Sequence, residues 1–329
     1  MVSTSRELEN RPDWRPRCDM ECLRQRAWML AEIRRYFREE GVMEVETPVL
    51  AGRVGTDPHL HFLAVEEGGH KLYLQTSPEF AMKRLLAAGS GDIYQIGKAF
   101  RGGERGRWHS LEFTLLEWYR VGYDLGRMMD DVASLLRRLL KDRIAGQERI
   151  RYGDLFRESI GVPWDAPISR LRQRASELGL AEAGAVCGHD RTLWLDFLFS
   201  HIAQPGLASR GLVFVYDYPA PMAALARLKP GDPGVAERFE VFLQGIELGN
   251  GYRELTDPKE QRARFEAERK TRAMAGLPCP ELDEAFLAAL ESGLPECSGV
   301  AVGLDRLLML KLGHASIDRV LTFPVQVPA

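Results

Sequence analysis

The chain has 329 residues, of which 45% are hydrophobic, a formal net charge of −3 at pH 7 and a pI near 6.2. This length and hydrophobic content allow a large buried core, which indicates a globular protein. The charge balance excludes a protein whose affinity comes from wrapping a polyanion, because that requires many clustered Lys and Arg residues.

The N-terminal residues, MVSTSRELENRPDW, contain no apolar core of a signal peptide, and no run in the sequence reaches the roughly 18 apolar residues that span a bilayer. The five cysteines form no CxxC pair, and their odd number is typical of reduced thiols in a cytosolic protein. We therefore expect a soluble, cytoplasmic protein that does not contact a membrane.

Residues 19–50 predict a long amphipathic helix followed by a short strand. Apolar side chains recur on one helix face at Leu23, Leu30, Ile33 and Phe37. Asp19 can cap the start of the helix and Gly41 can end it. Pro48 stops the strand because it cannot donate to a ladder, so the strand should lie at an edge or a subunit boundary.

The next stretch predicts a hairpin that leads directly into a helix. Residues 59–65 and 71–76 alternate between apolar and polar, with the turn EEGGH between them. Ser77-Pro78-Glu79 is a strong helix start. Glu79 is either a carboxylate that stabilises the helix start or a functional group.

Residues 93–120, IYQIGKAFRGGERGRWHSLEFTLLEWYR, predict a long hairpin: a strand to Phe100, a polar loop over 101–108 and a strand over 111–119. An arginine fork suits a phosphate, an aromatic face suits a purine, and glycines let a ligand approach the backbone. Arg101 and Phe113 therefore predict a nucleotide site. The alternative is an ordinary surface hairpin with a solvated arginine tip.

FRGGERGRWHSLEFTLLEWY resembles motif 2 of class II aminoacyl-tRNA synthetases, in the form found in lysyl-tRNA synthetases and their short paralogues, the elongation factor P lysylases. The resemblance runs from about Asp19 to the C-terminus, and residues 19–50 resemble the dimer-forming motif 1. It implies that this loop supplies ATP contacts from Arg101, Gly102, Gly103, Glu104, His109, Ser110 and Phe113. Two departures from the family pattern are Gly102-Gly103, where many relatives carry Asn-Glu, and Ser110-Leu111, where they carry Asn-Pro.

Residues 124–235 predict helices and one β-rich run. The helices are expected over 124–141, 169–178 and 192–202, the strand in LVFVYDYP, and loops over 161–167 and 230–234. No linker composition divides this stretch. We therefore expect a short extension over 1–18 and a single catalytic domain over 19–329, without the anticodon-binding barrel of lysyl-tRNA synthetases. His189 and His201 are interpreted as structural.

FEVFLQGIELGN predicts a second hairpin, which places Glu240 and Glu247 on neighbouring strands; Glu254 follows seven residues later. Such carboxylates are either solvated strand charges or ligands of a divalent cation. The resemblance of GIELGNGYREL to lysyl-tRNA synthetases implies that Glu240 and Glu247 bind Mg²⁺ and ATP. It also implies that Glu254, with Glu79, faces the side-chain ammonium of lysine.

CSGVAVGLDRLLML predicts a strand that turns into a helix with Arg306 in its first turn. Arginine is unfavourable at the positive end of a helix, which suggests an anion. The segment resembles motif 3, in which this arginine holds the γ-phosphate of ATP; Leu248 and Gly303 belong to the same implied site. The charged stretch 257–275 predicts a solvent-facing helix.

The sequence thus predicts an α+β fold, a class II synthetase-like antiparallel sheet flanked by helices, in a homodimer. The implied reaction is activation of lysine or β-lysine by ATP with Mg²⁺, with Arg101, Arg306 and Glu247 as catalytic residues, followed by transfer to elongation factor P and not to tRNA. The residues implied to bind the amino acid are Ser77, Pro78, Glu79, Tyr119, Glu254 and Ala301. Two alternatives stay open: a truncated lysyl-tRNA synthetase acting on tRNA or a small molecule, and a catalytically inactive regulatory paralogue.

Overall fold

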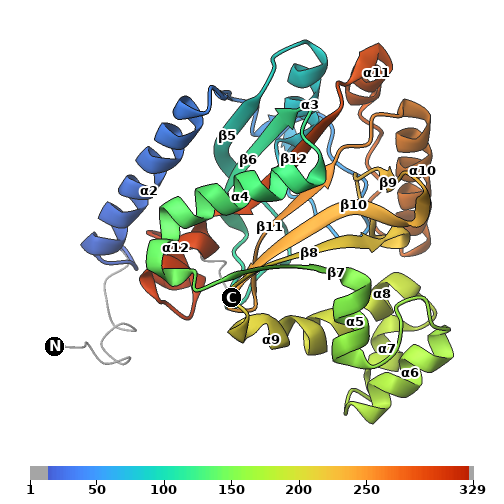
Figure 1. Ribbon diagram of the computed structural model, residues 1–329. Helices are drawn as coiled ribbons and strands as arrows, with labels where there is room; N and C mark the ends of the chain where they lie inside the picture. Colours follow the sequence, from blue (N-terminus) through green and yellow to red (C-terminus); the bar gives the residue numbers. More distant parts are fainter. Residues whose placement is uncertain (1–13, 326–329) are drawn as a thin grey trace.

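The computed structural model describes residues 14–325, and a large mixed sheet forms its centre (Figure 1). The strands of this sheet are β1 (Met43–Glu44), β5 (Ile93–Phe100), β6 (Glu112–Val121), β7 (Gln147–Arg151), β8 (Leu212–Pro219), β9 (Leu228–Lys229), β10 (Asp232–Leu243), β11 (Ile246–Arg253) and β12 (Cys297–Gly303). A smaller sheet contains β2 (Leu50–Ala51), β3 (Ala64–Glu67) and β4 (His70–Leu74).

The longer helices are α2 (Met20–Glu39), α3 (Glu79–Ala87), α4 (Leu125–Leu140), α5 (Tyr152–Ile160), α6 (Ile168–Glu177), α8 (Arg191–Leu198), α10 (Pro258–Met274), α11 (Glu284–Gly293) and α12 (Leu304–Leu312). Short helical turns are α7 (Ala183–Cys187), α9 (Gln204–Gly206), η1 (Lys141–Arg143), η2 (Phe199–Ala203), η3 (Leu207–Ser209), η4 (Ala220–Met222) and η5 (Ile317–Arg319). Among the described residues, none of the helices is both long and apolar enough to cross a membrane.

The strand order of the large sheet is β1-β5-β6-β12-β11-β10-β8-β7, with β9 paired to β10. Neighbours from β5 to β8 are antiparallel, which confirms the predicted α+β fold with an antiparallel sheet. Both edge pairs are parallel, β1 with β5 and β7 with β8, and the sequence did not predict these. Pairing at the edges depends on where distant segments return, which local pattern does not encode.

Most predicted elements lie where the sequence places them. The Asp19 carboxylate accepts a hydrogen bond of 2.8 Å from Cys22 N at the start of α2, and Gly41 follows the helix with φ +70°. The β10–β11 turn has positive φ at both Gln244 (54°) and Gly245 (73°), which is typical of a tight hairpin turn whose twist matches the strands. Three predictions were wrong in part. Residues 232–234 belong to β10 and not to a loop, and α10 buries one face. The strand expected over 59–65 is β3, which begins only at Ala64 and includes two residues of the expected turn.

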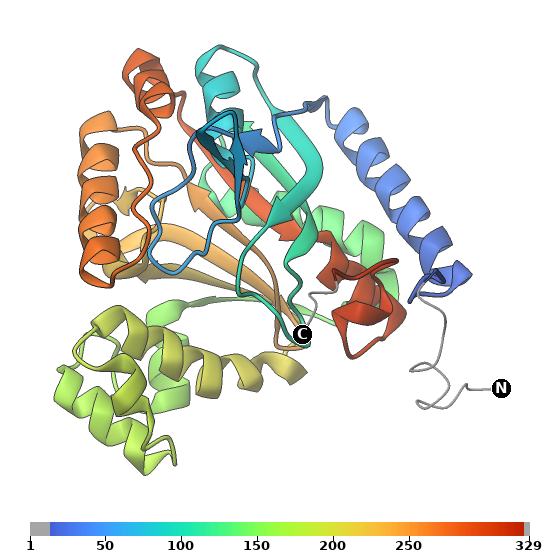
Figure 2. The same ribbon diagram turned by 180° about the vertical axis from the view of Figure 1, so that it is seen from behind.

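The sheet has two covered faces. Helices α2, α4 and α12 lie on one face, where Phe37 packs edge-on against Trp118 with ring centroids 5.4 Å apart (Figure 1). Helices α3, α10 and α11 lie on the opposite face (Figure 2), where Phe80 stacks on Phe286 at 4.4 Å. A separate apolar core joins α5–α9 to β8 and β10 on this second face.

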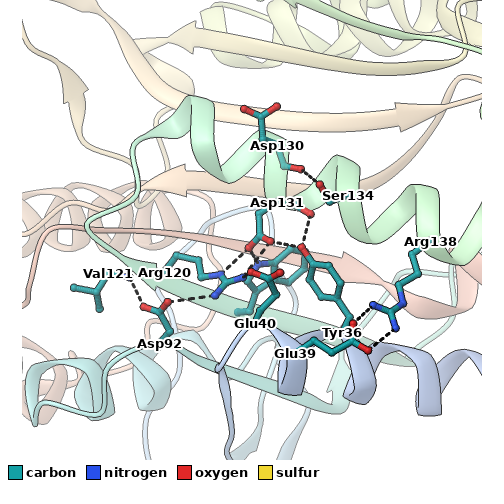
Figure 3. A network of polar contacts seen from close by, with 11 residues as sticks. Tyr36, Glu39, Glu40, Asp92, Arg120, Val121, Asp130, Asp131, Ser134 and Arg138 are labelled. Carbon is teal, nitrogen blue, oxygen red and sulfur yellow. Dashed lines mark hydrogen bonds and ion pairs between the residues drawn. The ribbon is translucent and has the colours of Figure 1, made fainter.

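A buried polar network ties α2, β6 and α4 together (Figure 3). The carboxylate of Asp131 on α4 accepts hydrogen bonds from Arg120 Nε at 2.7 Å, Trp118 Nε1 at 3.1 Å and the Tyr36 hydroxyl. Arg120 also lies 3.3 Å from Asp92. Burial and the bond to Asp131 raise the pKa of Tyr36. Because each charge is paired, this network fixes the helix layer on the sheet at low desolvation cost.

Candidate active site

The register of the sheet places the predicted site residues in rows on the face opposite α2 and α4. One row crosses four neighbouring strands through Glu117, Ala301, Asn250 and Glu240. The next row on the same face contains Tyr119, Gly299, Tyr252 and Arg238. Side chains two residues apart on a strand share a face, so residues from widely separated segments are collected on one surface.

Most of the predicted nucleotide residues line one cavity between the β5–β6 loop, β11 and the start of α12. They are Arg101, Glu104, His109, Ser110, Phe113, Glu247, Leu248, Gly303 and Arg306, joined by Ala301. Gly102 and Gly103 are not among its lining residues. Gly102 N donates a 2.8 Å hydrogen bond to His61 O, and a Cβ at position 102 would lie 3.1 Å from that oxygen. Glycine at 102 therefore permits close packing against residue 61.

Arg101 faces the aromatic wall of this cavity. Its guanidinium carbon lies 5.2 Å from the centroid of the Phe113 ring, and Nη1 lies 3.8 Å from the Glu104 carboxylate. Arg101 Nε and Trp108 Nε1 are buried and have no hydrogen-bond partner within residues 14–325. A cationic fork with a free donor, next to an aromatic face, matches a ligand with an anionic group and a flat ring system.

Arg306 lines the same cavity from the first turn of α12, and its Nε donates a 3.1 Å hydrogen bond to Trp108 O. The neighbouring Asp305 carboxylate accepts hydrogen bonds from Arg26 of α2 at 2.5 Å and from Thr114 N of β6 at 2.7 Å. These two bonds fix the start of α12 against both elements. Arg306 Nη1 donates to Glu247 O at 2.9 Å and lies 3.5 Å from Glu247 Oε2. A cation and a carboxylate therefore meet at the cavity wall.

A second, larger cavity of about 660 Å³ adjoins the first, and Arg101 and Asn250 line both. Its lining includes Ser77, Pro78 and Glu79 at the start of α3. The predicted substrate residues Tyr119 and Glu254 do not line it; they are buried, 2% and 1% exposed. They lie in a polar cluster that Glu79 joins to the cavity.

The centre of this polar cluster is Glu117, which sequence reasoning did not single out. Its carboxylate accepts hydrogen bonds from Ser77 Oγ at 2.6 Å and from the Tyr119 hydroxyl at 2.7 Å. Ser77 Oγ also accepts a 3.1 Å bond from Glu79 N. The serine thus connects the start of α3 to the carboxylate on β6.

Lys83 is the second unpredicted member of the cluster. Its side chain is fully buried, and Nζ lies 2.6 Å from Glu79 Oε1 and 2.6 Å from Glu254 Oε2. Burial lowers the pKa of Lys83, but the two carboxylates more than offset this effect, so the pKa is raised and the ammonium stays charged.

The carboxylates of the cluster carry more negative charge than Lys83 neutralises. Burial, reinforced by the nearby Glu79, raises the pKa of Glu117 to about 7. Burial also raises the pKa of Glu254 to about 8, with Lys83 acting against this and Glu79 adding to it. Such a buried, negatively charged site favours a ligand that brings ammonium groups.

Glu240 and Glu247 are the predicted metal ligands, and they lie on the paired strands β10 and β11; Glu247 lines the first cavity, whereas Glu240 is not among the lining residues of either cavity. Glu240 is bonded by Arg238 at 2.5 Å and by the Tyr218 hydroxyl at 2.7 Å, which leaves a lone pair on each oxygen. Burial raises its pKa to about 7, and Glu247 adds to this despite the opposing Arg238. Over the described part of the chain, no group of three or more His, Cys, Asp or Glu residues forms a metal site, so phosphate oxygens would have to complete the coordination.

Local sequence signals pointed to the residues that were missed. Lys83 follows Glu79 by four positions on one helix, the spacing of neighbouring side chains. Glu117 precedes Tyr119 by two positions on one strand, and Arg238 precedes Glu240 in the same way, so each pair shares a face. Sequence alone assigns such charged residues to solvent, but both faces of the sheet are covered, so these side chains are buried.

Comparison with known proteins identifies the class. A family model described as tRNA synthetases class II (D, K and N) matches residues 9–327, and the chain belongs to this family. Its relatives include proteins of a more specific name, elongation factor P--(R)-beta-lysine ligase. The relative from Vibrio cholerae is 48% identical over 319 residues, which cover 95% of this chain and 98% of that protein. Those from Proteus mirabilis and Klebsiella pneumoniae are each 45% identical, over 95% of this chain and 98% and 97% of their own lengths.

Proposed function

We propose that this protein is an AMP-forming ligase that activates lysine or β-lysine with ATP and transfers it to a lysine side chain of elongation factor P. The acceptor comes from the name of the relatives, which match this chain at 45–48% identity over about 95% of its length. The proposed chemistry depends on one observation, that the two cavities are adjacent. The first cavity is lined by arginine and aromatic side chains, and the second opens onto a buried acidic cluster.

In the first step, the substrate carboxylate attacks the α-phosphorus of ATP. A carboxylate–phosphorus bond forms, the bond to the bridging oxygen breaks, and pyrophosphate leaves. Arg101 would hold the α-phosphate and Arg306 the γ-phosphate, while Phe113 would stack on the adenine. A bound Mg²⁺ neutralises phosphate oxygens, and Glu240 and Glu247 would hold it. Positioning and charge stabilisation then account for the rate, because side chains perform no covalent chemistry.

In the second step, the amine nitrogen of the acceptor lysine attacks the carbonyl carbon of the aminoacyl-adenylate. An amide bond forms, the carbon–oxygen bond to the phosphate breaks, AMP leaves and the amine loses a proton to solvent. The acyl group is already activated, so a deprotonated primary amine is a sufficient nucleophile. Glu79, Glu254 and Tyr119 would hold the far ammonium of the bound lysine throughout.

The test of the acceptor is a direct competition. The enzyme is incubated with ATP, Mg²⁺ and lysine or β-lysine in the presence of equal concentrations of total tRNA and purified elongation factor P. Intact-mass measurement should show acylation of the protein, and acid-precipitable aminoacyl-tRNA should stay at background. Charged tRNA with an unshifted protein mass would instead support a free-standing tRNA ligase. Omission of ATP is the control.

We further propose a homodimer formed through residues 19–50 and a cytoplasmic location, where a translation factor is available. The homodimer is supported by apolar side chains that are exposed at the end of this segment: Met43 is 50% exposed, Leu50 41% and Val49 38%. Light scattering should give twice the chain mass, and Leu50→Glu should reduce it to the monomer. Residues 19–329 would act as one catalytic domain, which the continuous sheet from β1 to β12 supports.

A further inference from the structure

Lys83 is a fully buried lysine that the proposed chemistry does not use. Lysine is almost never fully buried unless its charge is paired. Here the ammonium contacts two carboxylates at 2.6 Å, one from its own helix α3 and one from the chain just after β11. Glu79, one of the two, reaches the larger cavity, so Lys83 lies directly behind the cavity wall.

The groups around Lys83 come from every element packed against it. Helix α3 supplies Glu79, β6 supplies Glu117 and Tyr119, and Glu254 follows β11. These groups influence one another electrostatically, as do Cys297 of β12 and Tyr252 of β11. The Phe286 ring of α11 lies 5.9 Å from the ammonium. Lys83 is the cation that contacts these carboxylates among the described residues.

The charges of this cluster match one class of substrate. When all three carboxyl groups are ionised, one ammonium set against three carboxylates leaves two negative charges, the number that the two ammonium groups of a diamino acid neutralise. An amino acid with a single ammonium group would leave one buried charge unpaired, which is costly.

We propose that Lys83 is a positioning and specificity-determining residue: it orients Glu79 and Glu254, supplies the counter-charge that both contact, and thereby makes the pocket selective for amino acids with two ammonium groups. This inference rests on the proposed amino-acid pocket. Lys83 itself would not touch the substrate; it would act through Glu79 and Glu254, which would.

The test compares Lys83→Met and Lys83→Arg with Lys98→Met, a matched control whose ammonium lies 3.1 Å from Glu112 on the surface. ATP–pyrophosphate exchange is measured with lysine across roughly pH 6–9, with norleucine as a competing ligand of neutral side chain. Removing a neighbouring cation raises a carboxyl pKa, and an ammonium binds the charged form. In Lys83→Met, KM for lysine should therefore rise about tenfold or more at pH 7, and the increase should become smaller as the pH rises to 9.

Further kinetic measurements distinguish a positioning role of Lys83 from a structural one. The kcat value and the inhibition constant of norleucine should change little in Lys83→Met, while Lys83→Arg and Lys98→Met should keep the wild-type pH profile. A rise in KM that is equal at every pH and is shared by norleucine would overturn the proposal. Circular dichroism verifies that each variant is folded, and Lys83→Gln is the second variant if Lys83→Met does not fold.

Calorimetry on the wild-type enzyme gives an independent result. At about pH 6.5, in two buffers of different ionisation enthalpy, lysine binding should release about one proton more than norleucine binding, because its second ammonium needs one more ionised carboxylate. Equal proton release would contradict the charge match. Wild-type exchange with lysine tests the proposed function itself: if exchange is normal but the Lys83 variants behave like Lys98→Met, only this inference fails.

Discussion

Ser77 Oγ lies 2.6 Å from Glu117 Oε2 and donates a hydrogen bond to this buried carboxylate, which connects the start of α3 to β6. The bond opposes the effect of burial on the pKa of Glu117. Ser77→Ala should therefore raise that pKa further and weaken binding of the substrate ammonium at neutral pH. We expect KM for lysine to increase about tenfold, since a lost bond to a charged group costs about 1.5–3 kcal/mol. Exchange kinetics measure this, with Ser134→Ala on α4 as the control.

Ala301 faces Glu117 and Asn250 across the strands, so its methyl group occupies the floor of the site. We predict that the enzyme prefers β-lysine to α-lysine, because lysyl-tRNA synthetases usually carry glycine at this position. Ala301→Gly should improve kcat/KM for α-lysine about tenfold, as a methyl group is worth about 1–3 kcal/mol. Ala236→Gly, a buried position on β10, is the matched control. A wild-type preference for α-lysine, or a variant that gains nothing, would contradict the prediction.

Arg306 and Glu247 lie 3.5 Å apart at the wall of the proposed nucleotide cavity. Arg306→Ala and Glu247→Ala should each reduce ATP–pyrophosphate exchange by about 10²-fold or more, because each removes a charge proposed to act on the polyphosphate or its metal. Arg105→Ala, on the exposed part of the same loop, should retain activity. Near-normal exchange in either site variant would contradict the assignment, provided that thermal melts show intact folding.

Buried carboxyl groups predict an unusual pH dependence of stability. Glu117 and Glu254 have folded-state pKa values of about 7 and 8, against 4.5 in an unfolded chain. Between about pH 4.5 and 8 the folded state therefore binds more protons than the unfolded state. The free energy of unfolding falls as the pH rises through this range. Glu117→Gln should lessen this fall by about 3 kcal/mol at most. Urea denaturation at several pH values tests it, with the exposed Glu66→Gln as the control.

Asp131 and Asp130 are neighbours on α4 with opposite environments. Asp131 is buried against Arg120, whereas the Asp130 side chain is 70% exposed. Asp131→Ala should lower the free energy of unfolding by about 3–5 kcal/mol, because it leaves a buried guanidinium unpaired. Asp130→Ala should change it by less than about 1 kcal/mol. Equal effects in denaturant titrations would show that the network does not stabilise the fold.

Local pattern predicted the hairpins and the helix starts because these depend on neighbouring residues. Alternation placed β5 and β6, and a capping carboxylate placed α2. The sequence also identified Arg101 and Arg306 by residue type. Their convergence on one cavity depends on strand order, which residue periodicity does not contain, so only the family resemblance anticipated it.

The acidic cluster was predicted incompletely for a physical reason. Charged side chains on a strand are normally assigned to solvent, and Glu117 and Arg238 fit that rule until both faces of the sheet are seen to be covered. The same holds for α10, whose charged sequence hides a face that buries Phe265 and Arg272. Helix α5 was missed although it carries a local signal: its buried apolar residues recur at helical spacing and Gly161 ends it in the left-handed conformation.

Strand β6 has different neighbours on its two faces. Glu117 and Tyr119 turn towards the amino-acid pocket, whereas Trp118 and Arg120 turn towards the network with Asp131 and, through it, α2 (Figure 3). Close-packed interiors transmit displacement with little loss. β6 therefore connects the proposed amino-acid pocket on one of its faces with α2 on the other. In the proposed dimer, a displacement of α2 by the second subunit would reach Glu117 and Tyr119 through β6 itself, with no loop between them.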